Sequence, residues 1–419
     1  MLPKTRNKGV PDVAGRVEMK LLLCCARTRR DPEVVARITT LLQEEVDWDY
    51  LLQTAGRHGM IPLLFWHLDH ACPEAVPEAY MTEFRRNFRS NSLKNLLLTG
   101  ELLKLYGLFE QNDIFAIPYK GPTLAASVYR DLSLRQAGDL DILVGMRDVL
   151  KAKELLLSLG YEPTPWRTVD QLSPTQEKAF LRFEREYAFW HEGAGISVEI
   201  QWEVIPRYLS FSWDPVTLRQ RRQVVSLGGG AVSTFVPEDL LLVLCIHGSK
   251  HFWERLRWVC DVGETVNLFR EMDWDDLIAR AAAFGSERML LLGLYLAHSL
   301  LNADVPVTLL DKARADPAVE RLAEDACRRL FSESDDTVEN LDWSAFHPFH
   351  YRMRERWRDR LGYVLLKLAE PNAADWMERP LPERLFPLYY VLRPLRLIRK
   401  FGRRLVKRIK EKGSPPLDS

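Results

Sequence analysis

The sequence contains few cysteines, and they follow no metal-binding spacing. Six cysteines occur among 419 residues, with no Cys-x-x-Cys pair. A structural zinc site is therefore not indicated. We expect the six to be reduced thiols that lie mostly in the core of a cytoplasmic protein. They are Cys24, Cys25, Cys72, Cys245, Cys260 and Cys327.

Long hydrophobic runs and an excess of one charge are also missing. The longest apolar runs, such as Leu290 to Leu296, are far shorter than the roughly 20 residues of a membrane-spanning helix. The first 15 residues have no apolar stretch, so we expect no secretory signal. Lysine and arginine total 58, as do aspartate and glutamate, so net charge indicates no partner. The length and the 47% hydrophobic content fit a globular protein of two or three domains.

The most informative stretch is residues 117–144, IPYKGPTLAASVYRDLSLRQAGDLDILV. An apolar segment at 115–119 predicts a short strand, Lys120-Gly121 predicts a turn, and 122–129 predicts a helix. The backbone N–H groups at the start of such a helix can hold an anion. The stretch therefore combines a strand, a glycine turn and a helix in the order that suits phosphate binding.

Two carboxylates, Asp139 and Asp141, stand two residues apart in the apolar run that ends this stretch. In a strand such residues share a face, so their side chains would lie together while Leu140 and Ile142 face the core. A buried carboxylate pair is costly unless a cation lies between them. Mg²⁺ prefers oxygen ligands completed by substrate phosphates, and two such ions can clamp a displacement at phosphorus. The combination favours nucleotidyl transfer; the alternative is a solvated pair on an edge strand.

The same window resembles the core motif of the polymerase-beta-like nucleotidyltransferase superfamily, and most closely the bacterial family of uncharacterised nucleotidyltransferases. The wider superfamily has Gly-Ser at the turn, whereas this chain has Gly121-Pro122 and so offers no serine hydroxyl to the phosphates. The residues that carry the resemblance are Lys120, Gly121, Tyr129, Arg135, Asp139, Asp141 and Val144.

A second acidic strand follows downstream. Strands are predicted at 183–191 and 196–204, joined by the hairpin signal Glu192-Gly193-Ala194-Gly195. The resemblance implies that Glu199 supplies the third metal carboxylate. The closest family usually has Asp-hydrophobic-His-Trp, where this chain has Glu199-Ile200-Gln201-Trp202. The side chain of glutamate is longer than that of aspartate, so its carboxylate oxygen would lie further out and would be a weaker general base. The alternative to a catalytic role is that Glu199 is a solvent-facing residue of the sheet.

Helices are predicted again from residue 236 to about 305. His247 and His251 have a helical spacing that can bind metal, but no HExxH pattern accompanies them. Lys250, with Arg255 and Arg257, would instead reach nucleotide phosphates. In the alternative interpretation, Asp261 is structural and pairs with one of these cations.

The C-terminal end is strongly basic. Between Arg393 and Lys412 there are ten lysines or arginines and one glutamate, a net charge of +9. Leu395, Ile398, Leu405 and Ile409 would form an apolar stripe on a helix. A basic amphipathic helix can lie on an anionic membrane or contact nucleic acid. The alternative is a helix docked on the protein by its apolar side.

Together these patterns predict an α+β protein. A polymerase-beta-like nucleotidyltransferase core, a small mixed sheet with helices, would be flanked by helical N- and C-terminal regions. The expected divisions are a disordered segment at 1–15, helices at 16–111, the core at 112–235, helices at 236–390 and a basic amphipathic tail at 391–419.

The predicted reaction moves an NMP from an NTP to an acceptor hydroxyl or phosphate, with release of pyrophosphate. Asp139 and Asp141 would bind Mg²⁺ or Mn²⁺, with Glu199 as a third ligand or as the base. Lys120, Gly121, Arg135 and Lys250 would bind the nucleotide, and Arg135 would contact the phosphates or support the loop. The acceptor class stays open between a sugar, a lipid head group, a protein and an RNA. One alternative is a catalytically degenerate nucleotide- or partner-binding protein. Another is an interaction protein associated with nucleic acid or with the inner face of the membrane.

Overall fold

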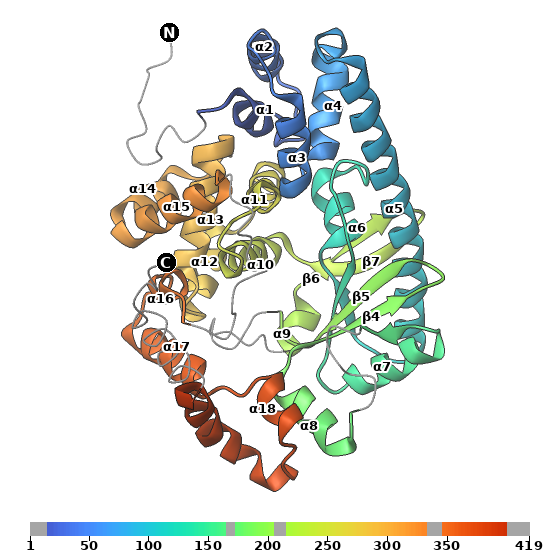
Figure 1. Ribbon diagram of the computed structural model, residues 1–419, viewed down its shortest axis with the longest axis vertical. Helices are drawn as coiled ribbons and strands as arrows, with labels where there is room; N and C mark the ends of the chain where they lie inside the picture. Colours follow the sequence, from blue (N-terminus) through green and yellow to red (C-terminus); the bar gives the residue numbers. More distant parts are fainter. Residues whose placement is uncertain (1–14, 165–171, 205–214, 333–345, 400–419) are drawn as a thin grey trace, which may run out of the picture.

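The computed structural model describes residues 15–164, 172–204, 215–332 and 346–399 (Figure 1). Within these ranges a small mixed sheet is flanked by helices that precede and follow it in the sequence. The predicted α+β class with helical flanks is confirmed. The segment expected to be disordered, 1–15, lies outside the described residues except for Gly15.

Helices alone make up the described chain before the sheet. The last of them, α5, is a single helix of 34 residues. It runs along one edge of the molecule and carries the chain from the N-terminal helices to the sheet (Figure 1). The elements are α1 (Val17–Cys25), α2 (Pro32–Leu41), α3 (Trp48–His58), α4 (Ile61–Ala71), η1 (Pro73–Ala75) and α5 (Glu78–Gln111).

The main sheet has five strands in the order β1-β2-β5-β4-β3. Strands β2 and β5 are parallel neighbours, and every other neighbouring pair is antiparallel. The strands are β1 (Ala116–Pro118), β2 (Leu140–Val144), β3 (Glu162–Pro163), β4 (Glu186–His191) and β5 (Ile196–Gln201). The helices between them are α6 (Gly121–Leu124), which continues as the π-helical turn η2 (Ala125–Tyr129), α7 (Val149–Ser158) and α8 (Pro174–Phe183).

Two features near the sheet differ from the sequence prediction. The strand expected at 183–191 begins at Glu186, because Phe183 ends α8. A capping box between Ser173 and Gln176 starts that helix. In addition, α9 (Pro215–Gln220) and a two-stranded hairpin, β6 (Arg222–Leu227) and β7 (Gly230–Phe235), were not identified from the sequence. Strand β7 packs against β1.

Helices after the hairpin form a second layer opposite the sheet (Figure 1). Helix α11 (Leu256–Leu268) is separated from the preceding helix, because the backbone of Phe252 and Trp253 is left-handed (φ 57° in both). Helix α13 is buried along most of its length and packs on α10, α11, α14 and α15. The helices are α10 (Pro237–Lys250), α11 (Leu256–Leu268), α12 (Trp274–Ala283), α13 (Glu287–Leu301), α14 (Val307–Ala315) and α15 (Pro317–Leu330).

The C-terminal part returns to the sheet. Phe180 of α8 contacts Trp376 (ring centroids 5.9 Å apart), and Phe183 contacts Tyr389 (5.8 Å). These contacts anchor the end of the described chain on α8. The elements are α16 (Pro348–Arg352), α17 (Trp357–Ala369), α18 (Ala373–Glu378), η6 (Glu383–Leu388) and a helical segment at residues 389–399.

Two of the basic residues assigned to the amphipathic tail form ion pairs within the fold. Asp375 forms ion pairs with Arg393 (3.1 Å) and Arg396 (2.7 Å), and the Arg393 side chain is buried. Both guanidinium groups are therefore paired within the protein, although they share one carboxylate. The remainder of the predicted tail, 400–419, lies outside the described residues. Among the residues that are described, no helix is both long and apolar enough to cross a membrane.

Candidate active site

A cleft of about 1120 Å³ lies between the main sheet and the helical layer. Its floor comes from the turn after β1 and from β2 and β5, and its opposite wall comes from α10, α11 and their connection. Seven residues predicted to bind metal or nucleotide line it. They are Lys120, Gly121, Arg135, Asp139, Asp141, Glu199 and Lys250. The fold thus brings together residues that are up to 130 positions apart in the chain.

The carboxylates meet because β2 and β5 are parallel neighbours. Asp141 and Glu199 are directly paired across these strands, so their side chains share one face of the sheet. The neighbouring positions Leu140, Ile142 and Ile200 belong to the hydrophobic core on the opposite face. Asp139 stands just before β2 and lines the same cleft. Alternation along the two strands therefore separates the charged face from the core.

Lys120 contacts the carboxylate group of Asp141 directly. Its Nζ lies 3.2 Å from Oδ1 of Asp141, and both side chains are largely buried. Burial alone would lower the pKa of Lys120, but the surrounding negative charges, with Asp141 foremost, raise it above its usual value. The ammonium group is therefore charged at neutral pH and balances part of the carboxylate charge.

Gln201 holds two of the carboxylates in place. Its Nε2 donates to Oδ1 of Asp141 (2.9 Å) and to Oε2 of Glu199 (3.2 Å). The Tyr119 hydroxyl donates to the Gln201 Oε1 (2.5 Å), which fixes the direction of the amide. The sequence showed Gln201 only as a departure from the usual histidine. Because Gln201 stands two residues after Glu199, strand alternation could have predicted that the two side chains share a face. No sequence pattern indicated the contact with Tyr119.

The pKa of Asp139 is raised to about 6 by burial and by the nearby charge of Asp141, against the opposing effect of Lys120. Between about pH 4 and pH 6 the folded protein therefore holds a proton that the unfolded chain has released. The free energy of unfolding should fall as the pH rises through this window, by on the order of 3 kcal/mol. Asp139→Asn removes this contribution, so its stability relative to wild type should increase with pH.

The measurement is urea denaturation of wild type and Asp139→Asn at several values between pH 4 and pH 7. Titration of groups far from Asp139 cancels in the difference between the two proteins. Asp275→Asn, at an exposed position of α12, serves as the control. If the difference in free energy of unfolding between wild type and Asp139→Asn stayed constant with pH, the pKa of Asp139 would not be raised.

Gly121 allows the turn after β1 to approach Asp139. Its φ is +55°, and a Cβ atom there would lie 2.8 Å from the backbone oxygen of Asp139. Gly121→Ala would therefore combine an unfavourable backbone conformation with a clash against backbone, a cost of about 1 to 3 kcal/mol. Gly195 has a similar φ of +63°, but its Cβ position is open. Urea denaturation should show a larger loss for Gly121→Ala than for Gly195→Ala, and equal losses would contradict the close approach.

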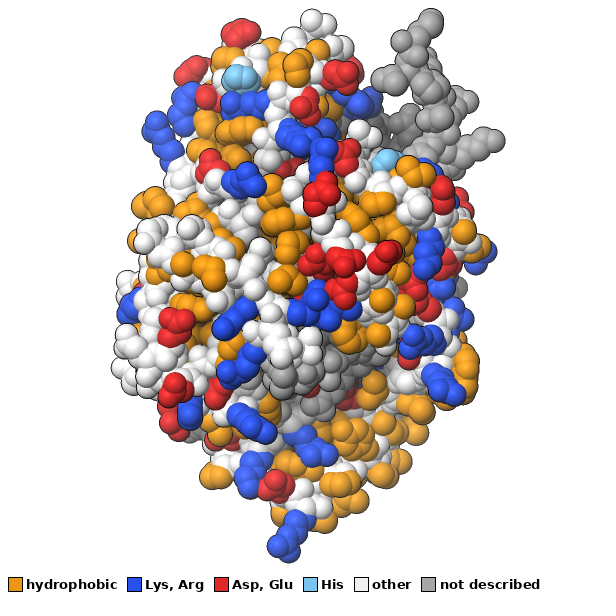
Figure 2. Space-filling view, turned by 180° about the vertical axis from the view of Figure 1, so that it is seen from behind, with side chains coloured by type: hydrophobic (Ala, Val, Ile, Leu, Met, Phe, Trp, Pro, Cys, Tyr) orange, Lys and Arg blue, Asp and Glu red, His pale blue; other side chains and the backbone are white. Residues whose placement is uncertain are grey.

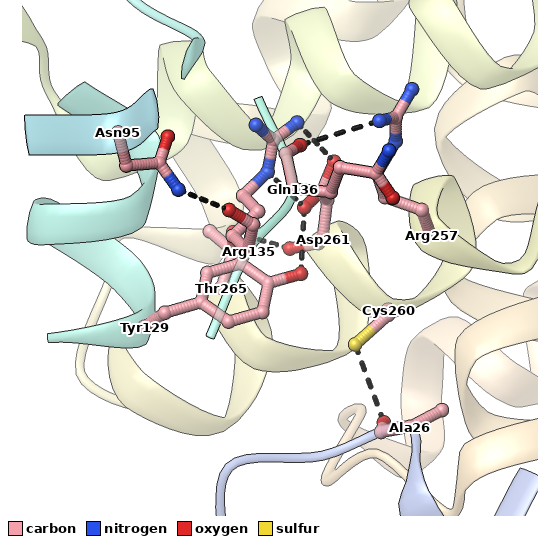
Figure 3. A network of polar contacts seen from close by, with 9 residues as sticks. All are labelled: Ala26, Asn95, Tyr129, Arg135, Gln136, Arg257, Cys260, Asp261 and Thr265. Atoms are coloured by element: carbon pink, nitrogen blue, oxygen red, sulfur yellow. Dashed lines mark hydrogen bonds and ion pairs between the residues drawn. The ribbon is translucent and has the colours of Figure 1, made fainter. Parts of the chain in front are cut away.

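Arg135 is bound to Asp261 of α11 (Figure 3). Its Nε donates to Oδ1 (2.8 Å) and its Nη2 to Oδ2 (3.0 Å), and the Tyr129 hydroxyl also donates to Oδ1 (2.7 Å). Asn95 of α5 donates to the Arg135 carbonyl (2.8 Å). This network joins the connection before β2 to both helical regions. Of the two roles expected for Arg135, its contacts favour support of the loop.

The partner of Asp261 differs from the sequence expectation. Lys250, Arg255 and Arg257 were the cations considered, but Asp261 forms its ion pair with Arg135. Arg257 lies close by and donates to the backbone oxygen of Gln136 (3.3 Å). These two arginines thus tie residues 135–136 to α11 from both sides (Figure 3).

Aromatic and imidazole rings form the wall that faces the carboxylates. His247 and His251 lie 4.7 Å apart between ring centroids, and both contact Trp258 (5.5 and 5.1 Å). Burial and nearby positive charges, including those of Lys120 and Lys250, lower the pKa of both histidines well below the usual value. Both imidazoles are therefore neutral at pH 7.

Lys250 lines the same wall, and burial lowers its pKa. The strained backbone of Phe252 and Trp253, both fully buried, fixes the turn between Lys250 and Arg255. Cationic side chains thus approach the cleft from the helical layer, on the side opposite Asp139 and Asp141.

The carboxylate oxygens suit a hard divalent cation, but they do not form a closed protein site. Within the described ranges, no three His, Cys, Asp or Glu side chains are arranged to hold a metal ion. Lys120 and Gln201 both contact Oδ1 of Asp141. An incomplete set of protein ligands is usual for Mg²⁺, which is bound by one or two carboxylates together with substrate phosphates. The donor set therefore fits a metal that arrives with a nucleotide.

Comparison with known proteins gives one match. The sequence model of a family described as "Uncharacterised nucleotidyltransferase" matches residues 44–302, more than half of the chain. The matched range includes all the cleft residues named above. Comparisons with curated proteins and with solved structures found no match.

Proposed function

The chain belongs to this family of uncharacterised nucleotidyltransferases, and from that premise we propose that it transfers a nucleoside monophosphate from an NTP to an acceptor. The acceptor oxygen, from a hydroxyl or a phosphate, would form a bond to the α-phosphorus. The bond from that phosphorus to the bridging oxygen would break, and pyrophosphate would leave. An acceptor hydroxyl would also lose a proton, and we propose Glu199 as the group that takes it.

Asp139 and Asp141 are the proposed ligands of Mg²⁺ or Mn²⁺, and Glu199 is the alternative third ligand if it does not act as the base. The metal would neutralise phosphate charge when bound. Lys120 lies against Asp141 and can move to a triphosphate, because its flexible stem carries a point charge. Lys250 and the turn at Gly121 would contact the phosphates from two sides of the cleft. Arg135 would act by positioning the loop that carries Asp139.

One observation supports this proposal more than any other. The parallel pairing of β2 and β5 places Asp141 beside Glu199, next to Lys120, at the floor of a large cleft. Carboxylates and a lysine that converge at one place can hold a metal and polyphosphate together. The cationic and aromatic wall opposite them leaves room for a nucleotide between the two layers.

A second candidate is a protein that binds nucleotide without turnover. Gln201 favours it, because its amide donates to both Asp141 and Glu199 and so competes with a metal and with a proton for their oxygens. Calorimetry of Mg²⁺-NTP binding, run beside a pyrophosphate-release assay with cell extract as acceptor source, separates the two. Binding with pyrophosphate release supports the transferase, binding without release supports the second candidate, and absence of both contradicts both.

A further inference from the structure

Helix α17 and the helical stretch that follows α18, from η6 to residue 399, present apolar side chains to solvent. On α17 they recur at intervals of three or four residues, and between residues 385 and 398 they recur at similar intervals. All are between 44% and 68% exposed. We call this set the C-terminal apolar face. Its members are Trp357, Leu361, Leu365, Leu368, Leu385, Leu388, Val391, Leu395 and Ile398.

The C-terminal apolar face lies opposite the side by which these helices are anchored. Tyr363 and Lys367 are the buried residues of α17, and Tyr389, Arg393 and Leu397 are buried in the following stretch. The helices are therefore held by one side while the other side carries large apolar groups. Figure 2 shows hydrophobic side chains gathered at the lower end of the molecule, where Figure 1 places these helices. Large exposed apolar side chains gathered in this way are typical of an interaction site.

The charges around the C-terminal apolar face are mostly positive. Exposed arginines flank α17 and the stretch that leads to residue 399, while the exposed Glu383 is paired with Lys178. The chain continues for 20 residues beyond 399, and those residues contain seven lysines or arginines and two acids. The exposed arginines are Arg356, Arg358, Arg379, Arg384 and Arg399.

We propose that the C-terminal apolar face docks on the surface of an anionic lipid bilayer. Interfacial helices bind a bilayer by this combination: apolar side chains that enter the headgroup boundary and basic residues that meet anionic lipids. The sequence predicted a membrane role for the basic tail at 391–419, which contains Val391, Leu395 and Ile398. The other six residues of the face lie before that tail, on α17 and η6. All nine of its residues also lie outside the part of the chain that matches the family, 44–302. The face would bring the cleft close to a membrane, although none of its residues lines the cleft.

The test is flotation of the full-length protein with phosphatidylcholine vesicles, with and without phosphatidylglycerol, at low and high salt. Wild type should bind the anionic vesicles, and high salt should weaken the binding, because exposed charges are screened. The variant Leu361→Ser with Leu365→Ser should lower the partition coefficient about tenfold or more, since each leucine loses most of its apolar transfer energy. Leu93→Ser with Leu97→Ser, at equally exposed positions of α5, is the matched control.

A second readout reports insertion directly. All six native cysteines are buried, so a cysteine introduced at Leu365 can be labelled selectively with a polarity-sensitive fluorophore. Its emission should shift to the blue with anionic vesicles, whereas a label at Leu93 should not shift. Deletion of 400–419 should reduce the salt dependence but keep the blue shift.

Three results would overturn the proposal. The first is absence of vesicle binding by wild type, and the second is an equal loss in the Leu361 and Leu93 double variants. The third is a dimer in sedimentation velocity that the Leu361 and Leu365 substitutions dissociate, which would show that a second copy covers this face.

Discussion

Asp139→Asn and Asp141→Asn are each expected to abolish metal-dependent NTP binding while they change stability in opposite directions. Each variant removes a proposed metal ligand, so affinity for Mg²⁺-NTP should fall by more than about 100-fold, beyond the loss typical of an outer-shell partner. Asp139→Asn removes a buried carboxylate that Asp141 disfavours, so it should raise the free energy of unfolding at pH 7. Asp141→Asn leaves Lys120 without its direct partner and should cost about 3 kcal/mol.

Isothermal calorimetry with Mg²⁺-NTP, together with urea denaturation of the apo proteins, measures both effects. Glu203→Gln is the matched control, because Glu203 lines the same cleft but pairs with Arg185 (3.4 Å). This control should keep nucleotide affinity within a small factor of wild type. Unchanged Mg²⁺-NTP binding by either aspartate variant would remove that residue from the proposed site. Equal stability changes would contradict the different roles of the two carboxylates.

Arg135→Met is expected to destabilise the protein by about 3 to 5 kcal/mol. The substitution leaves Asp261 as a buried carboxylate that retains a hydrogen bond from Tyr129 but loses both bonds from the guanidinium group. Because residues 135–136 connect to the strand that bears Asp141, nucleotide affinity should fall as well. The double variant Arg135→Met with Asp261→Asn should recover part of the stability, since it removes the unpaired charge.

Urea denaturation of the single and double variants measures this loss. Arg314→Met provides the comparison, because Arg314 pairs with Asp311 on the exposed side of α14. An exposed pair of this kind contributes less than about 1 kcal/mol. If Arg135→Met cost no more than Arg314→Met, the network would not be what holds the loop to α11.

The sequence allowed the carboxylate strands to be predicted because alternation along a strand is a local property. Asp139 and Asp141 with Leu140 and Ile142 between them already separate a polar face from a core face. The parallel pairing that sets Asp141 beside Glu199 joins residues 58 positions apart, and periodicity does not report it. The family resemblance supplied that relation.

The contacts that hold the site in place could not be read from the sequence. Arg135 and Asp261 are 126 positions apart, and several other cations near Asp261 were equally plausible partners by sequence alone. The amide of Gln201 makes two contacts that depend on its orientation, which Tyr119 determines from the residue just after β1. Such choices depend on the folded arrangement of three elements, so no local pattern encodes them.

The C-terminal apolar face shows another limit of periodicity. Leucines at helical spacing in 357–368 predict an amphipathic helix, but the pattern does not say which side faces the protein. Here Tyr363 and Lys367 are buried, while Leu361 and Leu365 are about half exposed. The packing of the neighbouring helices decides this, and it reverses the usual assignment of apolar residues to the core.

The most direct test of nucleotidyl transfer compares two labels on the same nucleotide. The purified protein is incubated with Mg²⁺ or Mn²⁺, cell extract as acceptor source, and NTP labelled with ³²P at either the α- or the γ-phosphate. Attack at the α-phosphorus predicts that acceptor is labelled from the α-position only, with γ-label recovered in pyrophosphate, and that the Asp139→Asn and Asp141→Asn variants give neither product. Label transferred from the γ-position, or α-label transferred equally well by both variants, would contradict this account.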